Sequence, residues 1–225
     1  MENSYDDTVY MDGLVRDGKH REAIGGMWEE IGQLQLDFLK RQGLRPAHRL
    51  LDLGCGALRG GVKFIAYLEP SHYWGIDNSA ALLEAGWEKE LAPLGLQQRQ
   101  PRAQLVCLSD FQFDTLGARF DFAIAQSVFT HMSLNRIRRC LARLAPHMES
   151  QGSLYATYFE TDGPHARESD KVHVPGGIVT HSDRDPYHYD LDDFEFVIRD
   201  LPWRIERIGA WDHPRDQRML RFTRT

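Results

Sequence analysis

The sequence has no apolar run of membrane-spanning length, and its first seven residues are polar and acidic rather than signal-like. Cysteine is scarce, with three residues that are scattered along the chain: Cys55, Cys107 and Cys140. An excess of basic charge is also lacking, because the formal net charge is −6. We therefore expect a cytoplasmic protein with no disulfide framework and no general affinity for nucleic acid. The net charge does not exclude a local basic patch.

Internal repeats and low-complexity tracts are absent as well, and 225 residues suit a single α/β domain. Strand-like apolar runs alternate with helical patterns along most of the chain. The expected strands are 48–53, 73–77, 104–108, 120–125, 153–159, 203–208 and 219–223. This order predicts a doubly wound, mostly parallel seven-stranded sheet of the Rossmann-like class, with an antiparallel last strand reached through a short turn.

Residues 50–56, Leu-Leu-Asp-Leu-Gly-Cys-Gly, are the most informative stretch. An apolar run ends in a Gly-x-Gly turn, which is typical of a buried parallel strand whose following loop approaches a ligand. Asp77 ends the next strand, about 20 residues further on, where an acid that binds ribose hydroxyls is expected. The pattern predicts a nucleotide-type site at the carboxyl ends of the strands.

The glycine spacing separates two ligand classes. A dinucleotide fingerprint has a third glycine three residues after the second, and Arg59 occupies that position. A large side chain would crowd a pyrophosphate, and Asp52 is better placed beside a cation than beside phosphates. These residues favour S-adenosylmethionine, which has an amino group and a sulfonium but no phosphate, over NAD.

At this point the chain resembles the class I S-adenosylmethionine-dependent methyltransferases. The resemblance rests on the glycine-rich segment 50–56, on Ile76-Asp77, on Ser109-Asp110-Phe111 and on the fourth-strand segment 120–132. One departure is Leu58, which stands where many members have a third glycine, with Gly60 and Gly61 following. The resemblance implies that S-adenosylmethionine is the cofactor. The residues expected to bind it are Asp52, Gly54, Cys55, Gly56, Arg59, Asp77, Asn78, Asp110, Phe111, Gln126 and Ser127.

The resemblance also implies a division of the chain. Residues 1–48 would form a helical segment that covers the site, in which Trp28 either packs or covers the cofactor. Residues 49–225 would form the methyltransferase domain, with an acceptor-side lid at about 160–190.

Histidines near the expected site are candidates for catalysis, because an acceptor hydroxyl must lose a proton. His131 follows the fourth strand; its alternative role is to cap or pack the next helix. In the long aperiodic segment 160–189 we expect Tyr187 and His188 to face the acceptor, the alternative being a solvated loop with incidental histidines. The spacing of His165, His173, His181 and His188 with Asp162, Asp170, Asp183 and Asp185 matches no metal-ligand motif, so no metal is expected.

The predicted function is methyl transfer to a small-molecule acceptor, at oxygen rather than nitrogen, by a monomer or homodimer with no membrane or nucleic acid partner. The arginines at 136, 138, 139 and 143 are more consistent with a solvated helix face than with a nucleic acid contact. Two alternatives stay open: a non-catalytic protein that binds S-adenosylmethionine, and an NAD-dependent oxidoreductase.

Overall fold

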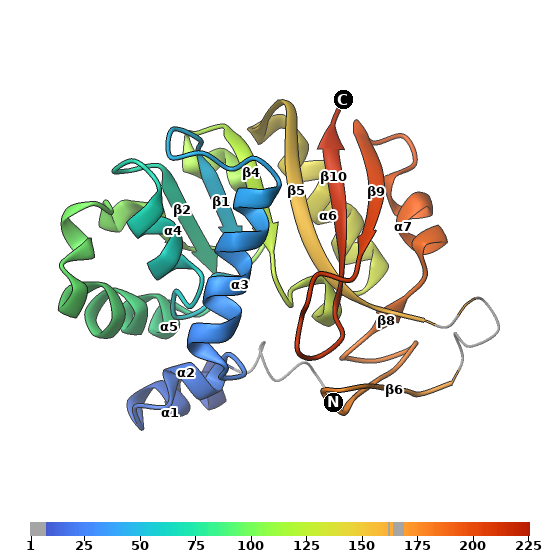
Figure 1. Cartoon of the computed structure of the whole chain (residues 1–225), viewed down its shortest axis with the longest axis horizontal. Coiled ribbons are helices and arrows are strands. Elements are labelled where there is room, and N and C mark those ends of the chain that lie inside the picture. Colours follow the sequence, from blue (N-terminus) through green and yellow to red (C-terminus); the bar gives the residue numbers. More distant parts are fainter. Residues whose placement is uncertain (1–7, 162, 164–168) are drawn as a thin grey trace. The chain divides into compact units, whose positions relative to one another are not determined.

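The computed structural model describes residues 8–161, 163 and 169–225. It divides into two compact units, residues 1–110 and 111–225, which are described here one at a time (Figure 1). No helix in the described part of the chain is both long and apolar enough to cross a bilayer.

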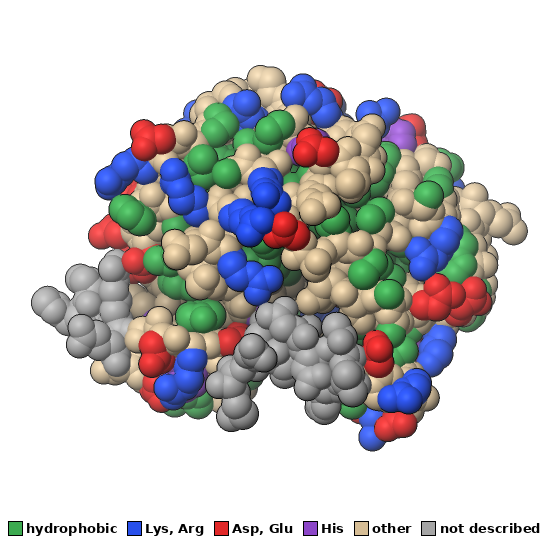
Figure 2. Space-filling model, turned by 180° about the vertical axis from the view of Figure 1, so that it is seen from behind, with side chains coloured by type: hydrophobic (Ala, Val, Ile, Leu, Met, Phe, Trp, Pro, Cys, Tyr) green, Lys and Arg blue, Asp and Glu red, His purple; other side chains and the backbone are tan. Residues whose placement is uncertain are grey.

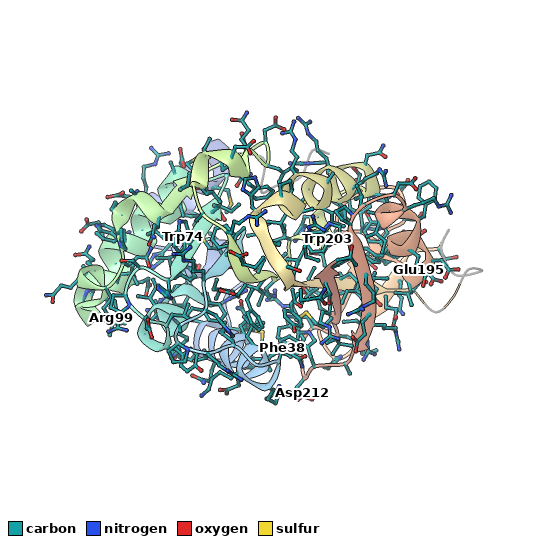
Figure 3. All side chains as sticks on the ribbon, turned by 90° about the horizontal axis from the view of Figure 1, so that it is seen from above. Phe38, Trp74, Arg99, Glu195, Trp203 and Asp212 are labelled. Carbon is teal, nitrogen blue, oxygen red and sulfur yellow. The ribbon has the colours of Figure 1, made fainter. Side chains whose placement is uncertain are left out.

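The first unit consists of helices around three parallel strands in the order β3-β2-β1. Its elements are α1 (Thr8–Arg16), α2 (His20–Ala23), α3 (Trp28–Arg41), β1 (Leu50–Leu53), α4 (Gly61–Tyr67), β2 (Tyr73–Asp77), α5 (Ala80–Ala85), the π-helix η1 (Gly86–Leu91) and β3 (Leu105–Cys107). All four residues of β1 are buried, as expected for a parallel strand covered on both faces. α3 packs on α4, and its Phe38 is buried (Figures 1 and 3).

The apolar pattern of residues 22–42 predicts one or two amphipathic helices; the structure has two, α2 and α3, separated by three consecutive residues with left-handed backbone. Gly25, Gly26 and Met27 have φ values of 87°, 65° and 49°. Glycine adopts this conformation without steric cost, which is why the chain reverses here between α2 and α3. The break produces a short connection, residues 24–27, which we call the strap.

The second unit contains a sheet in the order β4-β5-β10-β9, with β8 paired to the end of β5. Its elements are β4 (Phe120–Ala125), α6 (Leu134–Leu144), β5 (Met148–Glu160), β6 (Lys171–His173), β7 (Ile178–Thr180), β8 (His188–Tyr189), α7 (Leu191–Ile198), β9 (Trp203–Gly209) and β10 (Arg218–Arg224). β10 is antiparallel to both neighbours, whereas β4 and β5 are parallel. The predicted fold class, with its antiparallel last strand, is confirmed.

The predicted strand number is wrong by one. Apart from the separate pair β6–β7, the strands within the described residues number eight rather than seven. The additional strand, β8, is only two residues long and pairs with Phe159 and Glu160. A two-residue strand has no periodicity that a sequence pattern can reveal. β6 and β7 form a separate antiparallel pair.

An aromatic cluster forms the core of the second unit. Phe194 of α7 lies within 5.1–6.4 Å of the ring centroids of Tyr158, Tyr189, Phe222 and Phe129. Trp203 of β9 donates its indole N–H to the carbonyl of Leu141 in α6, which fixes the helix on the sheet (Figure 3). Burial of these rings anchors the strands whose ends carry the polar groups described next.

Candidate functional site

The turn after β1 has the backbone that the glycine pattern predicts. Gly54 and Gly56 have φ values of 68° and 53°. The N–H groups of Gly54 and Cys55 both donate to the carbonyl of Ile76, at 2.8 and 3.0 Å, which ties the turn to the end of β2. Leu58 also has a left-handed φ, 70°, and is fully buried. The conformation expected of a third glycine is therefore kept by leucine, whose buried side chain offsets the steric cost.

Asp77 joins this turn to the following helix. Its carboxylate accepts from the N–H of Gly56 at 2.8 Å and from the N–H of Ser79 at 2.9 Å. Ser79 in turn caps α5 by accepting from Leu82. Burial raises the pKa of Asp77, and backbone N–H donors from Ser79, Gly56 and Asn78 act against that rise. The acid predicted to bind ribose thus also shapes the glycine turn.

Asp52 lies beneath the turn, inside β1, and only 4% of it is exposed. The hydroxyl of Tyr73 donates to its carboxylate at 2.8 Å. Burial raises the pKa of Asp52 to about 7; the Tyr73 hydrogen bond lowers it, nearby Asp77 raises it and Arg59 lowers it. Cys55 is buried beside these acids, and burial raises the pKa of its thiol well above the usual range. A thiol held neutral is a poor nucleophile, so the structure gives Cys55 no sign of a nucleophilic role.

Arg59 is buried and directed at the strap. Its Nη1 donates to the carbonyls of Ile24 and Gly26, at 3.1 and 2.7 Å. A Cβ added at Gly56 would come within 2.8 Å of Ile24 Cγ2, so the strap lies directly against the glycine turn. The contact of Arg59 with the cofactor stays a prediction. In the structure, its hydrogen bonds go to the strap.

A buried ion-pair cluster anchors the strap at its other side, and sequence analysis missed it. Glu90 of η1 accepts from His20 at 2.6 Å and from Arg21 through two bonds, at 2.8 and 2.7 Å. The Arg21 guanidinium also lies 4.6 Å from the ring centroid of Trp28. Burial alone would raise the pKa of Glu90, but the Arg21 and His20 hydrogen bonds outweigh it and lower the pKa. Trp28 thus packs on this cluster.

The third and fourth strand ends carry the remaining predicted cofactor residues. Asp110 and Phe111 are partly exposed, and Phe111 lies 6.2 Å from the ring of Phe113. In the second unit, Ser127 has a left-handed φ of 57°, and its N–H donates to Thr157 Oγ1 at 2.7 Å.

Gln126 and Ser127 belong to a largely buried polar network. Ser127 Oγ lies within hydrogen-bonding distance of Gln126 and Gln217. Gln217 accepts from Thr157, and Gln126 also contacts His213. These bonds hold the polar end of β4 against β5 and β10 in one arrangement.

His131 forms a dyad with Asp185. Its Nδ1 lies 2.5 Å from Asp185 Oδ1, and the two side chains are 22% and 17% exposed. The dyad joins the turn after β4 to the segment 160–189. The sequence pattern pointed to Asp185 only as a possible metal ligand.

Tyr187 and His188 differ in exposure. Tyr187 is partly exposed and stacks on Tyr189, with ring centroids 5.9 Å apart. His188 is 3% exposed, and its Nδ1 bonds to Thr180 Oγ1, which also contacts His173. Burial lowers the pKa of His173 to about 4, so this interior histidine is neutral near pH 7. Burial makes His188 a less direct candidate for touching an acceptor than Tyr187.

The expected lid at 160–190 contains the hairpin β6–β7 and the strand β8, while residues 162 and 164–168 lie outside the described part, including Asp162 and His165. Within the described residues, no group of three or more His, Cys, Asp or Glu side chains is arranged to hold a metal ion.

Figure 2 shows the molecule from behind the view of Figure 1. Outside the grey residues, basic and acidic side chains are interspersed on this face.

Comparison with known proteins gives a family model and several structures. A model described as a methyltransferase domain matches residues 51–154. The structure is similar to magnesium protoporphyrin IX methyltransferase from Synechocystis PCC 6803 with bound S-adenosylmethionine, at 19% identity and a TM-score of 0.65, covering 98% of this chain and 97% of that one.

Two further solved structures share the fold. An amino pentose methyltransferase from Micromonospora echinaspora, involved in calicheamicin biosynthesis, is 17% identical with a TM-score of 0.64, covering 94% of this chain and 97% of that one. An S-adenosylmethionine-dependent methyltransferase from Clostridium acetobutylicum ATCC 824 is 13% identical with a TM-score of 0.63, covering 99% of each chain.

Proposed function

We propose that the chain is a class I S-adenosylmethionine-dependent methyltransferase, which transfers a methyl group from S-adenosylmethionine to an oxygen atom of a small-molecule acceptor; the match of residues 51–154 to a methyltransferase domain supports this proposal. The observation that carries the proposal is the carboxylate of Asp77 bound to the N–H of Gly56. A glycine turn beside an acid at the end of the next strand is the arrangement by which doubly wound sheets bind a nucleoside, with the acid on the ribose hydroxyls.

The donor set fits this cofactor. A carboxylate has roughly four lone-pair positions, and three backbone N–H groups bond to Asp77. Because Asp77 is also partly exposed, a ribose hydroxyl can add to these donors. We assign the ribose to Asp77, the adenine to Asp110 and Phe111, and the methionine part to the turn 54–56.

The remaining predicted contacts have supporting roles in the proposal. Asp52 is bonded to the hydroxyl of Tyr73 inside the sheet that carries the turn, and Arg59 holds the strap against Gly56. Cys55, Asn78, Gln126 and Ser127 stay predicted cofactor contacts.

In methyl transfer the protein itself forms no covalent bond with the methyl group. S-adenosylmethionine, when bound, supplies an electrophilic methyl group on a sulfonium. The protein aligns the acceptor and removes the proton of its hydroxyl. We assign proton removal to His131, which is partly exposed, and acceptor contact to Tyr187 and, in second place, His188. A small acceptor is supported by the porphyrin and amino pentose methyltransferases among the similar structures.

Calorimetric titration with S-adenosylmethionine and with NAD tests the cofactor. We expect binding of S-adenosylmethionine alone, weakened about 10- to 100-fold in Asp77→Asn, because a hydrogen bond to a charged group contributes about 1.5–3 kcal/mol. Asp17→Asn, which changes an exposed acid of the same unit, is the matched control and should bind like the parent. Binding of NAD in place of S-adenosylmethionine, or unchanged affinity in Asp77→Asn, would overturn the assignment.

A further inference from the structure

The contact between His131 and Asp185 joins two segments that are 54 residues apart in sequence. Two other hydrogen bonds fasten the same segments together. The N–H of Tyr187 donates to the carbonyl of Thr130 at 2.8 Å, and the hydroxyl of Tyr189 donates to the carbonyl of Met132 at 2.5 Å. Backbone and aromatic bonds on both sides of His131 therefore hold the Asp185 carboxylate against Nδ1.

Other histidines of the second unit have different surroundings. His173 and His188 are almost fully buried and share one threonine hydroxyl. His181 pairs with Asp170, whose side chain is 56% exposed and screened by water. His131 combines partial exposure of its ring with a carboxylate that is only 17% exposed. Such a partner orients the imidazole and stabilises it when it takes up a proton.

We propose that Asp185 is the positioning residue for His131, and that the pair commits the enzyme to acceptors with a neutral hydroxyl group, an alcohol or a phenol, rather than a carboxylate. The inference rests on the proposed function. With Nδ1–H bonded to Asp185, the lone pair of the neutral ring is on Nε2. A carboxylate acceptor is already ionised near neutral pH and would have no use for a base.

The acceptor hydroxyl gives its proton to His131 Nε2 while its oxygen lone pair forms the bond to the methyl carbon. The carbon–sulfur bond breaks, and its electron pair stays on sulfur. The products are a methyl ether, S-adenosylhomocysteine and a proton on His131, which passes to water.

Nitrogen-15 spectroscopy of the full chain labelled at histidine rings tests the positioning role without any acceptor. His131→Asn identifies the His131 signals among those of the ten histidines. We expect His131 to carry its neutral-state proton on Nδ1, and to lose this preference in Asp185→Ala. Asp183→Ala removes an exposed acid from the same loop and should leave the His131 signals unchanged. Equal signals in the parent and Asp185→Ala would overturn the role of Asp185.

Kinetics on acceptors found by a labelled-methyl screen provide the second readout. General base catalysis contributes about 10²–10⁴-fold, so we expect Asp185→Ala to lower kcat by at least about tenfold, with partial recovery in Asp185→Glu. The affinity for S-adenosylmethionine should stay at the parent value. Efficient methylation of a carboxylic acid that is undiminished in Asp185→Ala would contradict the acceptor class.

The two proposals fail in different ways. Absence of S-adenosylmethionine binding would overturn the proposed function itself. Intact binding together with an unchanged His131 tautomer in Asp185→Ala would overturn only the inference about Asp185.

Discussion

We expect the buried carboxyl of Asp52 to make the protein less stable as the pH rises, and Asp52→Asn to remove this effect. The carboxyl is buried inside β1, and burial raises its pKa from 3.8 to about 7. Between these values the folded protein keeps a proton that the unfolded chain releases, so stability falls as the pH rises. Below 3.8 both states are protonated, and above 7 both are ionised with the full penalty present.

The size of the effect follows from the pKa difference. At 1.36 kcal/mol per pH unit, the penalty is roughly 2 kcal/mol at pH 5 and roughly 4 kcal/mol at pH 8. Asparagine has nearly the same shape, its carbonyl oxygen can still accept from Tyr73, and it carries no charge. The stability of Asp52→Asn relative to the parent should therefore increase by about 2–3 kcal/mol between pH 5 and pH 8.

Urea unfolding followed by circular dichroism at pH 5 and pH 8 measures this difference. Asp17→Asn, at an exposed position, is the control and should show no comparable change between the two pH values. A relative stability of Asp52→Asn that is equal at both pH values would refute the reasoning, because it would mean that burial does not penalise the Asp52 charge.

Two further predictions concern the packing around the glycine turn. Gly32→Ala should destabilise the protein by roughly 1–3 kcal/mol in urea unfolding, because its Cβ would lie 2.6 Å from the carbonyl oxygen of Arg59. Gly13→Ala is the control, because a Cβ at this position in α1 would have nothing within 4 Å; it should stabilise the protein by about 0.5–1 kcal/mol. A Gly32→Ala protein that is as stable as the Gly13→Ala protein would disprove the contact with Arg59. Glu90→Gln should cost about 1–3 kcal/mol at pH 7 in thermal or urea unfolding, since it breaks a buried pair whose cation is half exposed. The lowered pKa of Glu90 means that this loss is present above the ordinary glutamate pKa and fades as the pH falls below it, whereas exposed Glu88→Gln should be neutral throughout.

Much of the fold could be predicted because its strands are short apolar runs with clear ends. The predicted ranges 73–77 and 120–125 coincide with β2 and β4. The predicted strand 153–159 corresponds to β5, which begins five residues earlier, at Met148. Gln151 has a left-handed φ of 64°, and a Cβ at Gly152 would lie within 2.9–3.1 Å of three backbone oxygens. This glycine allows a close approach inside the strand rather than marking its start.

The candidate site divides in the same way. The turn at 54–56 and Asp77 could be located from local spacing, and in the structure the N–H of Gly56 donates to the carboxylate of Asp77. The partners of Glu90 and His131 could not be predicted, because they lie 54–70 residues away in the sequence and no local pattern indicates pairs at such distances. Leu58 shows a further limit, since a left-handed backbone at a buried leucine depends on packing that the sequence pattern does not express.

Product analysis tests the central claim most directly. The parent protein is incubated with methyl-labelled S-adenosylmethionine and fractionated small-molecule extracts, and labelled product and S-adenosylhomocysteine are quantified by mass spectrometry. The account predicts that both appear in equal amounts, and that His131→Asn slows their formation about 100-fold or more without weakening cofactor binding. S-adenosylmethionine that binds the parent protein but never gives up its methyl group would contradict the account, and would instead indicate a cofactor-binding protein without turnover.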